Sequence, residues 1–241
     1  MVFHGGSPSS RWKWPALVEV MGRSGLRVLV YDRPGYGGST RRPGRAVADA
    51  VDDVRALADA QGWGRFGVFG GSGGGPHALA CAALLGDRVT SCAVLSGVKP
   101  ADVGVPVLEE GELRGRIAEV AAEIMGRIDG GGPELPNGAG PAARDDSDAM
   151  ARLRATFVDS VDGWVDDTFA LARSWGFELA TITAPVGLWS GTADADVSSE
   201  HADYLLEHIP TAKGHVYTGG HLPGPEVYDE IYNWLLSRAV T

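Results

Sequence analysis

Short runs of β-branched and aromatic residues alternate along this chain with longer stretches in which apolar residues recur at helical spacing. The short runs predict five strands, at residues 28–31, 66–69, 89–95, 186–189 and 215–217. Strands separated by helices form a mostly parallel sheet with helices on both faces. We therefore predict an α/β fold.

The stretches between the runs predict four helices, at residues 46–61, 76–85, 200–208 and 226–238. In the first of them, Val47, Val51 and Val54 share one face, and aspartates near its start suit the positive end of the helix dipole. The second is almost entirely apolar, which predicts that it is buried. The last follows Pro225, a favourable residue for a first helical turn.

Residues 99–183 interrupt this alternation. They contain no convincing strand, but two apolar stripes at helical spacing, one beginning at Leu113 and the other at Met150, predict a helical insertion. Its middle, residues 130–141, is rich in glycine and proline and predicts a flexible loop.

Composition excludes several classes of protein. The longest apolar run, residues 78–85, is less than half as long as a membrane-spanning segment. The N-terminal residues also lack the basic stretch followed by an apolar stretch that is typical of a signal peptide. A net charge of −10 opposes binding to nucleic acid or to anionic lipid. The two cysteines, Cys81 and Cys92, lie in apolar surroundings, so we expect small core residues, no disulfide framework, no zinc site and a cytoplasmic protein.

Gly70-Gly71-Ser72-Gly73-Gly74 satisfies the pattern G-x-S-x-G, in which a serine occupies a strained turn between a strand and a helix. Chance alone supplies about 0.3 such matches in this composition, so the pattern is weak by itself. The apolar strand that precedes it and the helix that follows Pro76 supply the required context. A glycine-rich phosphate loop is the alternative interpretation. Such loops carry a lysine, and this chain has neither lysine nor arginine within ten residues downstream of the turn. We predict that Ser72 is a nucleophile.

A serine nucleophile needs a base and the base needs a carboxylate. Of the six histidines, His221 is the strongest candidate, because it follows the last strand in a glycine-rich loop at the sheet's C-terminal edge. Asp194 and Asp196 follow the preceding strand at the same edge. One of these two aspartates should face His221.

The chain resembles the α/β-hydrolase family in five elements that occur in the family's order: His4-Gly5-Gly6, residues 31–39, the turn around Ser72, Gly191 to Asp194, and Gly220-His221. The resemblance implies a Ser72, His221 and Asp194 triad, with Asp194 rather than Asp196 as the acid. It also implies an oxyanion hole made by the backbone N–H groups of Gly6 and Gly73, and a structural role for His4. Residues 99–183 would form a helical cap over a core of residues 1–98 and 184–241, with no metal or cofactor.

This resemblance suggests a serine hydrolase that cleaves an ester or amide of a small, apolar substrate, with an acyl-enzyme intermediate. The doubled glycines also resemble proline iminopeptidases, whose recognition of a free amine requires carboxylates in the cap. Glu109, Glu110, Glu112, Asp166 and Asp167 are candidates for that role, although a solvated face is the simpler interpretation. A peroxidase-like activity, cleavage of a carbon–carbon bond, or a non-catalytic member that binds a small ligand would suit the same fold.

The family places two strands before the one that leads into His4, whereas here three residues precede it. Without that pair, the strand from Val28 to Tyr31 becomes an exposed sheet edge with unpaired backbone groups. We expect a homodimer across this edge or an aggregation-prone monomer, unless the true start lies upstream. A short first strand would also leave Gly6 weakly anchored and the activity low.

Overall fold

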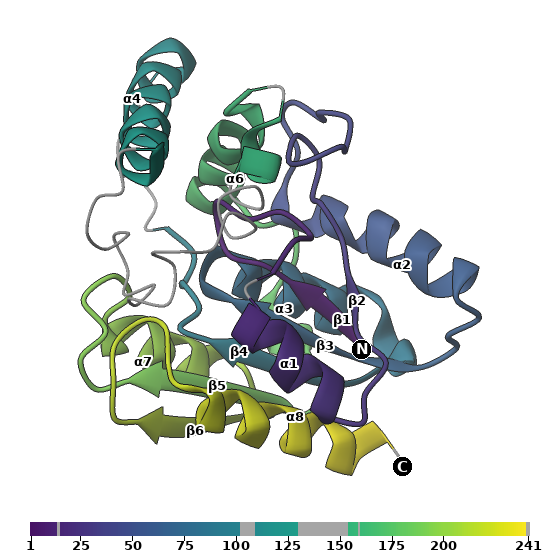
Figure 1. Ribbon diagram of the computed structural model, residues 1–241. Coiled ribbons are helices and arrows are strands. Elements are labelled where there is room, and N and C mark those ends of the chain that lie inside the picture. The colour runs from purple at the N-terminus through teal and green to yellow at the C-terminus, as the bar shows by residue number, and fades with distance from the viewer. Residues whose placement is uncertain (14, 102–108, 130–153, 159, 240–241) are drawn as a thin grey trace.

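The computed structural model describes residues 1–13, 15–101, 109–129, 154–158 and 160–239. Its centre is one six-stranded sheet in the order β2-β1-β3-β4-β5-β6, and every neighbouring pair is parallel (Figure 1). The strands are β1 (Val2–His4), β2 (Leu29–Val30), β3 (Phe66–Gly71), β4 (Val89–Leu95), β5 (Val186–Gly191) and β6 (Ala212–Tyr217). The predicted α/β fold is therefore confirmed.

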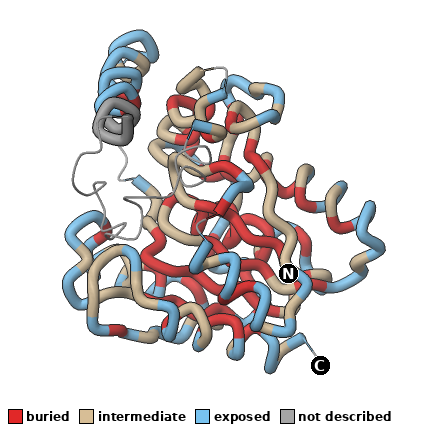
Figure 2. Tube along the Cα trace, in the orientation of Figure 1, coloured by how far each residue is buried: buried red, intermediate tan, exposed pale blue. Residues whose placement is uncertain are grey.

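Helices cover both faces of this sheet. One face packs against α2 (Ala50–Ala60), α3 (Gly75–Leu84) and α7 (Ser199–His208), and the other against α1 (Pro15–Arg23) and α8 (Pro225–Ala239). Parallel strands require such cover because both of their faces are buried. Figure 2 accordingly shows the buried residues concentrated along the strands.

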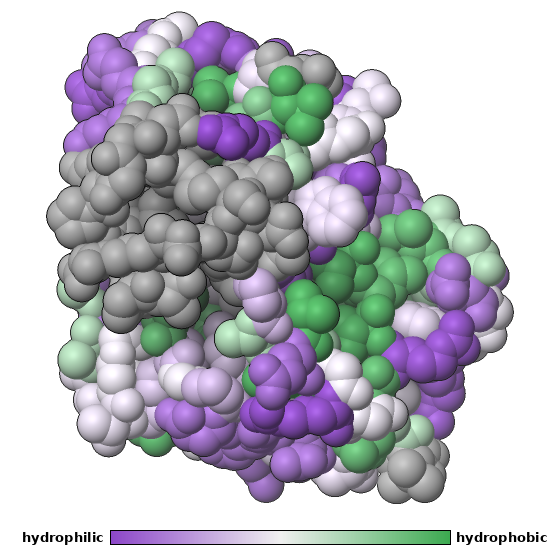
Figure 3. Space-filling model, in the orientation of Figure 1, coloured by the Kyte–Doolittle hydropathy of each residue, from purple (hydrophilic) through white to green (hydrophobic). Residues whose placement is uncertain are grey.

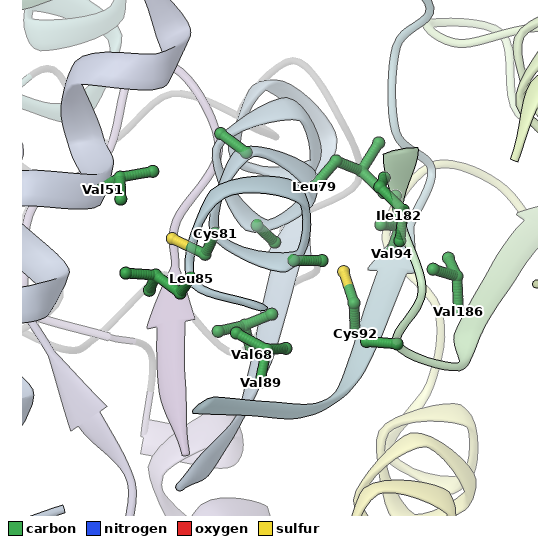
Figure 4. Close-up of a cluster of buried hydrophobic side chains, with 14 of the residues drawn as sticks. Val51, Val68, Leu79, Cys81, Leu85, Val89, Cys92, Val94, Ile182 and Val186 are labelled. Atoms are coloured by element: carbon green, nitrogen blue, oxygen red, sulfur yellow. The ribbon is translucent and has the colours of Figure 1, made fainter. Parts of the chain in front are cut away.

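Side chains that alternate along the strands divide into two apolar cores. Val68 and Val94 belong to the core under α3, whereas Phe69 and Leu95 belong to the core under α8. This follows from the two-residue period of a strand, which points successive side chains to opposite faces. Cys81 and Cys92 are free thiols in the first core (Figure 4), as predicted.

The chain between β4 and β5 adds helices beyond the carboxyl ends of the strands. Two of them, α4 (Glu110–Asp129) and α6 (Asp162–Ala172), pack together, and a short turn at Ala155–Phe157 precedes α6. Ile117 and Ala121 of the predicted stripe are buried on α4. The predicted loop at 130–141 and the start of the second stripe lie outside the described residues.

Helix α1 is an addition to the predicted set. Its apolar residues Leu17, Val20 and Met21 have helical spacing, but nine residues are too few for periodicity to distinguish a helix from a loop. Strand bounds also differ: β2 holds two of the four predicted residues, and β6 begins three residues early. Within the described ranges, no helix combines the length and apolar character that a membrane crossing requires.

Strand β2 lies at the end of the sheet order and pairs only with β1 among the described strands. Figure 3 shows apolar side chains gathered in the region of the molecule where β1 and β2 lie. An exposed strand edge offers unpaired N–H and C=O groups to another chain. Dimerisation through residues 28–31 stays a prediction, now with a defined edge.

We expect light scattering to give a mass twice that of the 25.2 kDa chain, and Val30→Lys to return the single-chain mass, because a charge at the edge disfavours pairing. Val18→Lys is the control, since Val18 is an exposed valine on α1. A monodisperse monomer that neither change affects would contradict the prediction. Circular dichroism verifies that both variants remain folded.

Candidate active site

Ser72 lies at the turn between β3 and α3, at the carboxyl edge of the sheet. Its φ of +50° is rare for a residue with a side chain, and a one-turn 3-10 helix, Ser72–Gly74, leads into α3. A Cβ on Gly70 would lie 2.3 Å from the carbonyl oxygen of Gly74, and a Cβ on Gly74 equally close to that of His4. The glycines of the motif are thus required by the close approach of three backbone segments, which confirms the predicted strand, turn and helix.

His221 and Asp194 are in direct contact. The Nδ1 atom of His221 lies 2.9 and 3.1 Å from the two carboxylate oxygens of Asp194. Oδ1 of Asp194 also accepts hydrogen bonds from the backbone N–H groups of Asp196 and Val197, at 3.0 and 2.9 Å. The Asp196 side chain itself is exposed, so Asp194 is the aspartate that faces His221.

Ser96 is a further part of this arrangement, which the sequence analysis did not single out. Burial by itself raises the pKa of Asp194, but hydrogen bonds from the Val197 N–H, the Ser96 hydroxyl and His221 bring it below its ordinary value. The carboxylate is therefore ionised at neutral pH. Ser96 follows β4, so its position at the carboxyl end of a strand was the available signal.

Two clefts of about 540 and 220 Å³ open beside Ser72. Trp164 and Leu171 of α6 line the larger one, together with His201, whose Nδ1 accepts the backbone N–H of Lys99. His221 lines the smaller one. The larger cleft falls in the size range of small-molecule sites.

The smaller cleft is mostly apolar, with phenylalanine and leucine side chains in its wall. Lys13 also lines it, and its ammonium donates to Ser9 Oγ and to the carbonyl oxygen of Ser10, both at 2.5 Å. Burial and the nearby Arg33 lower the pKa of Lys13 to about 7. Lys13 is a second residue that the sequence analysis did not anticipate.

The two glycines expected to supply an oxyanion hole flank Ser72. A Cβ built on Gly6 would lie 3.4 Å from the Cβ of Ser72, so the β1 loop approaches the serine closely at this point. Gly73 follows Ser72 directly, at the start of the turn. The structure thus brings both predicted backbone positions to the serine.

Two further histidines are buried beneath the turn. His4 lies against Tyr31 and Cys81, in a position that suits a structural role. His77 Nδ1 donates to the carbonyl oxygen of Gly73 at 2.9 Å, which places the ring proton on Nδ1. Burial, reinforced by Arg33, lowers the pKa of His77 to about 3.

The neutral His77 predicts acid destabilisation. Between pH 6.5 and 3 the unfolded chain binds a proton here that the folded chain does not, so stability falls as the pH falls through 6.5. His77→Asn keeps a donor for Gly73 without a titrating group. From pH 7.5 to 5, we expect wild type to lose about 2 kcal/mol more unfolding free energy than this variant, at 1.36 kcal/mol per pH unit. Urea unfolding at both pH values measures these losses. Equal losses of unfolding free energy in wild type and in His77→Asn would contradict the prediction.

Among the described residues, one cluster could hold a metal ion. The ligand atoms of Asp194, Asp196 and His221 lie within 4.8 Å of one another. Imidazole and carboxylate groups suit several divalent metals. His221 Nδ1 and the Asp194 carboxylate are already paired with each other. A metal bound through His221 Nδ1 would have to displace that contact.

A family model described as alpha/beta hydrolase fold matches residues 1–138, more than half of the chain. The chain belongs to the α/β-hydrolase fold family. No curated protein sequence matches it significantly.

Solved structures with this α/β-hydrolase fold include a thermophilic esterase from Thermogutta terrifontis, in a malate-bound structure, with a TM-score of 0.71 and 24% identity over 98% of this chain and 89% of that one. A bromoperoxidase from Bacillus anthracis has a TM-score of 0.72 and 21% identity, covering 100% and 91%. The enol-lactonase of Burkholderia xenovorans LB400 has a TM-score of 0.71 and 20% identity, over 100% of this chain and 90% of that one. At these identities the likeness establishes the fold, and function has to be argued from the site.

Proposed function

We propose that this α/β-hydrolase is a serine hydrolase that cleaves an ester of a small, largely apolar substrate. The observation that carries the proposal is the contact between His221 Nδ1 and the Asp194 carboxylate, in a cleft that His221 shares with the strained Ser72. A base oriented by a buried carboxylate, in the same cleft as a half-buried serine, is the arrangement that activates such a nucleophile.

In the proposed reaction, Ser72 Oγ attacks the ester carbonyl carbon while His221 Nε2 takes its proton. The carbonyl oxygen becomes an oxyanion that accepts hydrogen bonds from the N–H groups of Gly6 and Gly73. His221 then returns the proton to the departing alcohol, and an acyl group remains on Ser72. Water, deprotonated by His221, releases the acid in the second half of the reaction.

The helical insertion is assigned as the cap. We place it at residues 99–183, with residues 1–98 and 184–241 as the core. Its support is that Trp164 and Leu171 of α6 form part of the larger cleft wall. The cap would set the size of the substrate and exclude water during acyl transfer.

The aminopeptidase alternative needs free carboxylates to bind an amine. Asp166 and Asp167, the buried candidates, are both paired with arginines. Glu110 pairs with Arg41 and Arg114. These pairings favour an ester substrate over an amino-terminal one.

A fluorophosphonate probe tests the proposal, because it forms an adduct with an activated serine and spares a mere binding pocket. We expect one adduct, placed at Ser72 by mass spectrometry, and hydrolysis of short-chain p-nitrophenyl esters. Ser9→Ala is the matched control, since Ser9 is a second serine of the smaller cleft, and it should keep the adduct. An unlabelled native protein that binds ligands would favour a non-catalytic member of the fold.

A further inference from the structure

A cluster of buried charges lies beneath the candidate site and joins the insertion to the core. Its centre is Asp167 of α6, whose side chain has no exposure. The carboxylate contacts the guanidinium groups of Arg33 and Arg45 at 2.5 and 2.6 Å. It also accepts the hydroxyl groups of Tyr36 and Ser7 at 3.0 and 2.5 Å. Charges that are fully buried persist only when several hydrogen bonds hold them, as here.

Arg33 connects this carboxylate to the loop that carries Gly6. Its Nη1 donates to the carbonyl oxygen of Gly5 at 2.5 Å, and its Nη2 donates to that of Gly6 at 2.8 Å. The Gly5 carbonyl and the Gly6 N–H belong to one planar peptide group. By holding the oxygen of that peptide, Arg33 sets the direction of the N–H on its other side.

The turn side of the site lies against the same carboxylate. His77, which donates to the carbonyl oxygen of Gly73, has its Nε2 3.9 Å from Asp167 Oδ1. Ser7 is close to Gly73 as well, because a Cβ on Gly73 would lie 2.7 Å from Ser7 Oγ. Asp167 therefore stands between the two backbone segments that flank Ser72.

We infer that Arg33, held by Asp167 of the cap, is a positioning residue that orients the Gly5–Gly6 peptide, so that the oxyanion hole is complete only when α6 is docked. The inference rests on the proposed function, because it assigns a task to the Gly6 N–H group. Oxyanion donors stabilise a transition state only if they already point at the developing charge. A rotated Gly5–Gly6 peptide would leave substrate binding nearly unchanged and would slow acyl transfer.

The chain contains a matched pair for the experiment. Asp166, next to Asp167 on α6, is also buried, and both of its oxygens accept from Arg41 at 2.8 Å. Arg41 binds further carboxylates of the insertion, Glu110 and Asp162. This second ion pair fastens α6 in the same way but has no contact with the Gly5–Gly6 carbonyls among the described residues.

The decisive comparison is Arg33→Lys against Arg41→Lys. Both keep the positive charge, but a lysine has a single nitrogen and cannot reproduce the planar fork that binds Asp167, Gly5 and Gly6 together. We expect Arg33→Lys to lower kcat on a p-nitrophenyl ester by about 100-fold, the loss expected for one oxyanion donor, with KM within about twofold. Arg41→Lys should leave both constants within about twofold.

A transition-state analogue separates positioning from folding. Affinity for a trifluoromethyl ketone, which forms an oxyanion on the enzyme, should fall in Arg33→Lys by the same factor as kcat/KM. Affinity for the product acid should not change. A purely structural role would lower the melting temperature of both lysine variants and leave these two affinities in their wild-type ratio.

Ser7→Ala provides a second, uncharged route to the same answer. It removes a hydroxyl that bonds Asp167 and Arg33 and that lies at the wall of both clefts, and we expect kcat to fall about tenfold, the effect of one hydrogen bond to a charged group. It decides the question if Arg33→Lys does not fold. Asp167→Asn is less suitable, because it leaves two buried guanidinium groups without their shared carboxylate.

The outcomes separate this inference from the proposed function. A wild type that the fluorophosphonate probe fails to label overturns the serine hydrolase and the positioning role with it. A labelled, active wild type whose folded Arg33→Lys and Ser7→Ala variants keep kcat within threefold overturns the positioning role alone. A rise in KM at constant kcat would place Arg33 in substrate binding instead, and would also overturn the inference.

Discussion

Ser72→Ala should lower ester turnover by about 10⁵- to 10⁶-fold, the loss observed when a triad nucleophile is removed. The reason is that no other hydroxyl follows β3 on a turn that points it at the cleft of His221. KM for the ester should change little, because Ser72→Ala removes one hydroxyl and leaves the other residues that line both clefts unchanged. Steady-state kinetics with a p-nitrophenyl ester measures the loss. The enzyme concentration has to be high enough to detect the residual activity.

The control for that loss is Ser72→Gly. The φ of +50° costs a residue with a side chain roughly 1–2 kcal/mol, which glycine does not lose. This variant should be as inactive as Ser72→Ala but should melt at a higher temperature. Activity that survives in either folded variant would remove Ser72 from the mechanism.

Asp194→Asn should lower kcat by about 10⁴-fold, the effect of replacing the triad carboxylate in a comparable enzyme. The asparagine oxygen can still accept the N–H groups of Asp196 and Val197. Its amide nitrogen then faces His221 Nδ1 and donates to it, which drives the ring proton to Nε2. The imidazole would have no lone pair left to accept the serine proton.

Asp196→Asn is the matched variant, two residues away, and should change kcat by less than about threefold. Its backbone N–H binds Asp194, and its side chain, although it lines the larger cleft, is exposed, where charge changes have small effects. Both variants are compared by kcat and by thermal melting. A larger effect at Asp196 than at Asp194 would transfer the role of the acid to Asp196.

Several parts of this site were accessible to prediction because their signals are local. Positions 70 and 74 are glycines because a Cβ there would clash with neighbouring backbone. The apolar run before them indicates a buried strand. Residues that follow parallel strands meet at one edge of the sheet, so Asp194 and His221 could be expected together from their places after β5 and β6.

Other parts had weak local signals. The nine residues of α1 span too few turns for a periodic apolar stripe to be distinctive. At the sheet edge, only two of the four residues predicted as a strand pair as β2. Ser96 has no pattern around it that separates it from an ordinary serine after a strand. Its role depends on Asp194, which is nearly a hundred residues away in sequence.

The sequence by itself determined the alternation of strands with helices from residue 28 onward, the burial of the cysteines and the turn at Ser72, because each depends on propensity, periodicity or steric limits within a few neighbouring residues. The resemblance in sequence already favoured Asp194 over Asp196 as the partner of His221, whereas tertiary structure alone decided that Asp167 pairs with Arg33 beneath the Gly5–Gly6 peptide. An aspartate in a helix has the same local signal whether it is solvated or buried. Only the packing of α6 against the core supplies the guanidinium groups and excludes the water that separate the two cases.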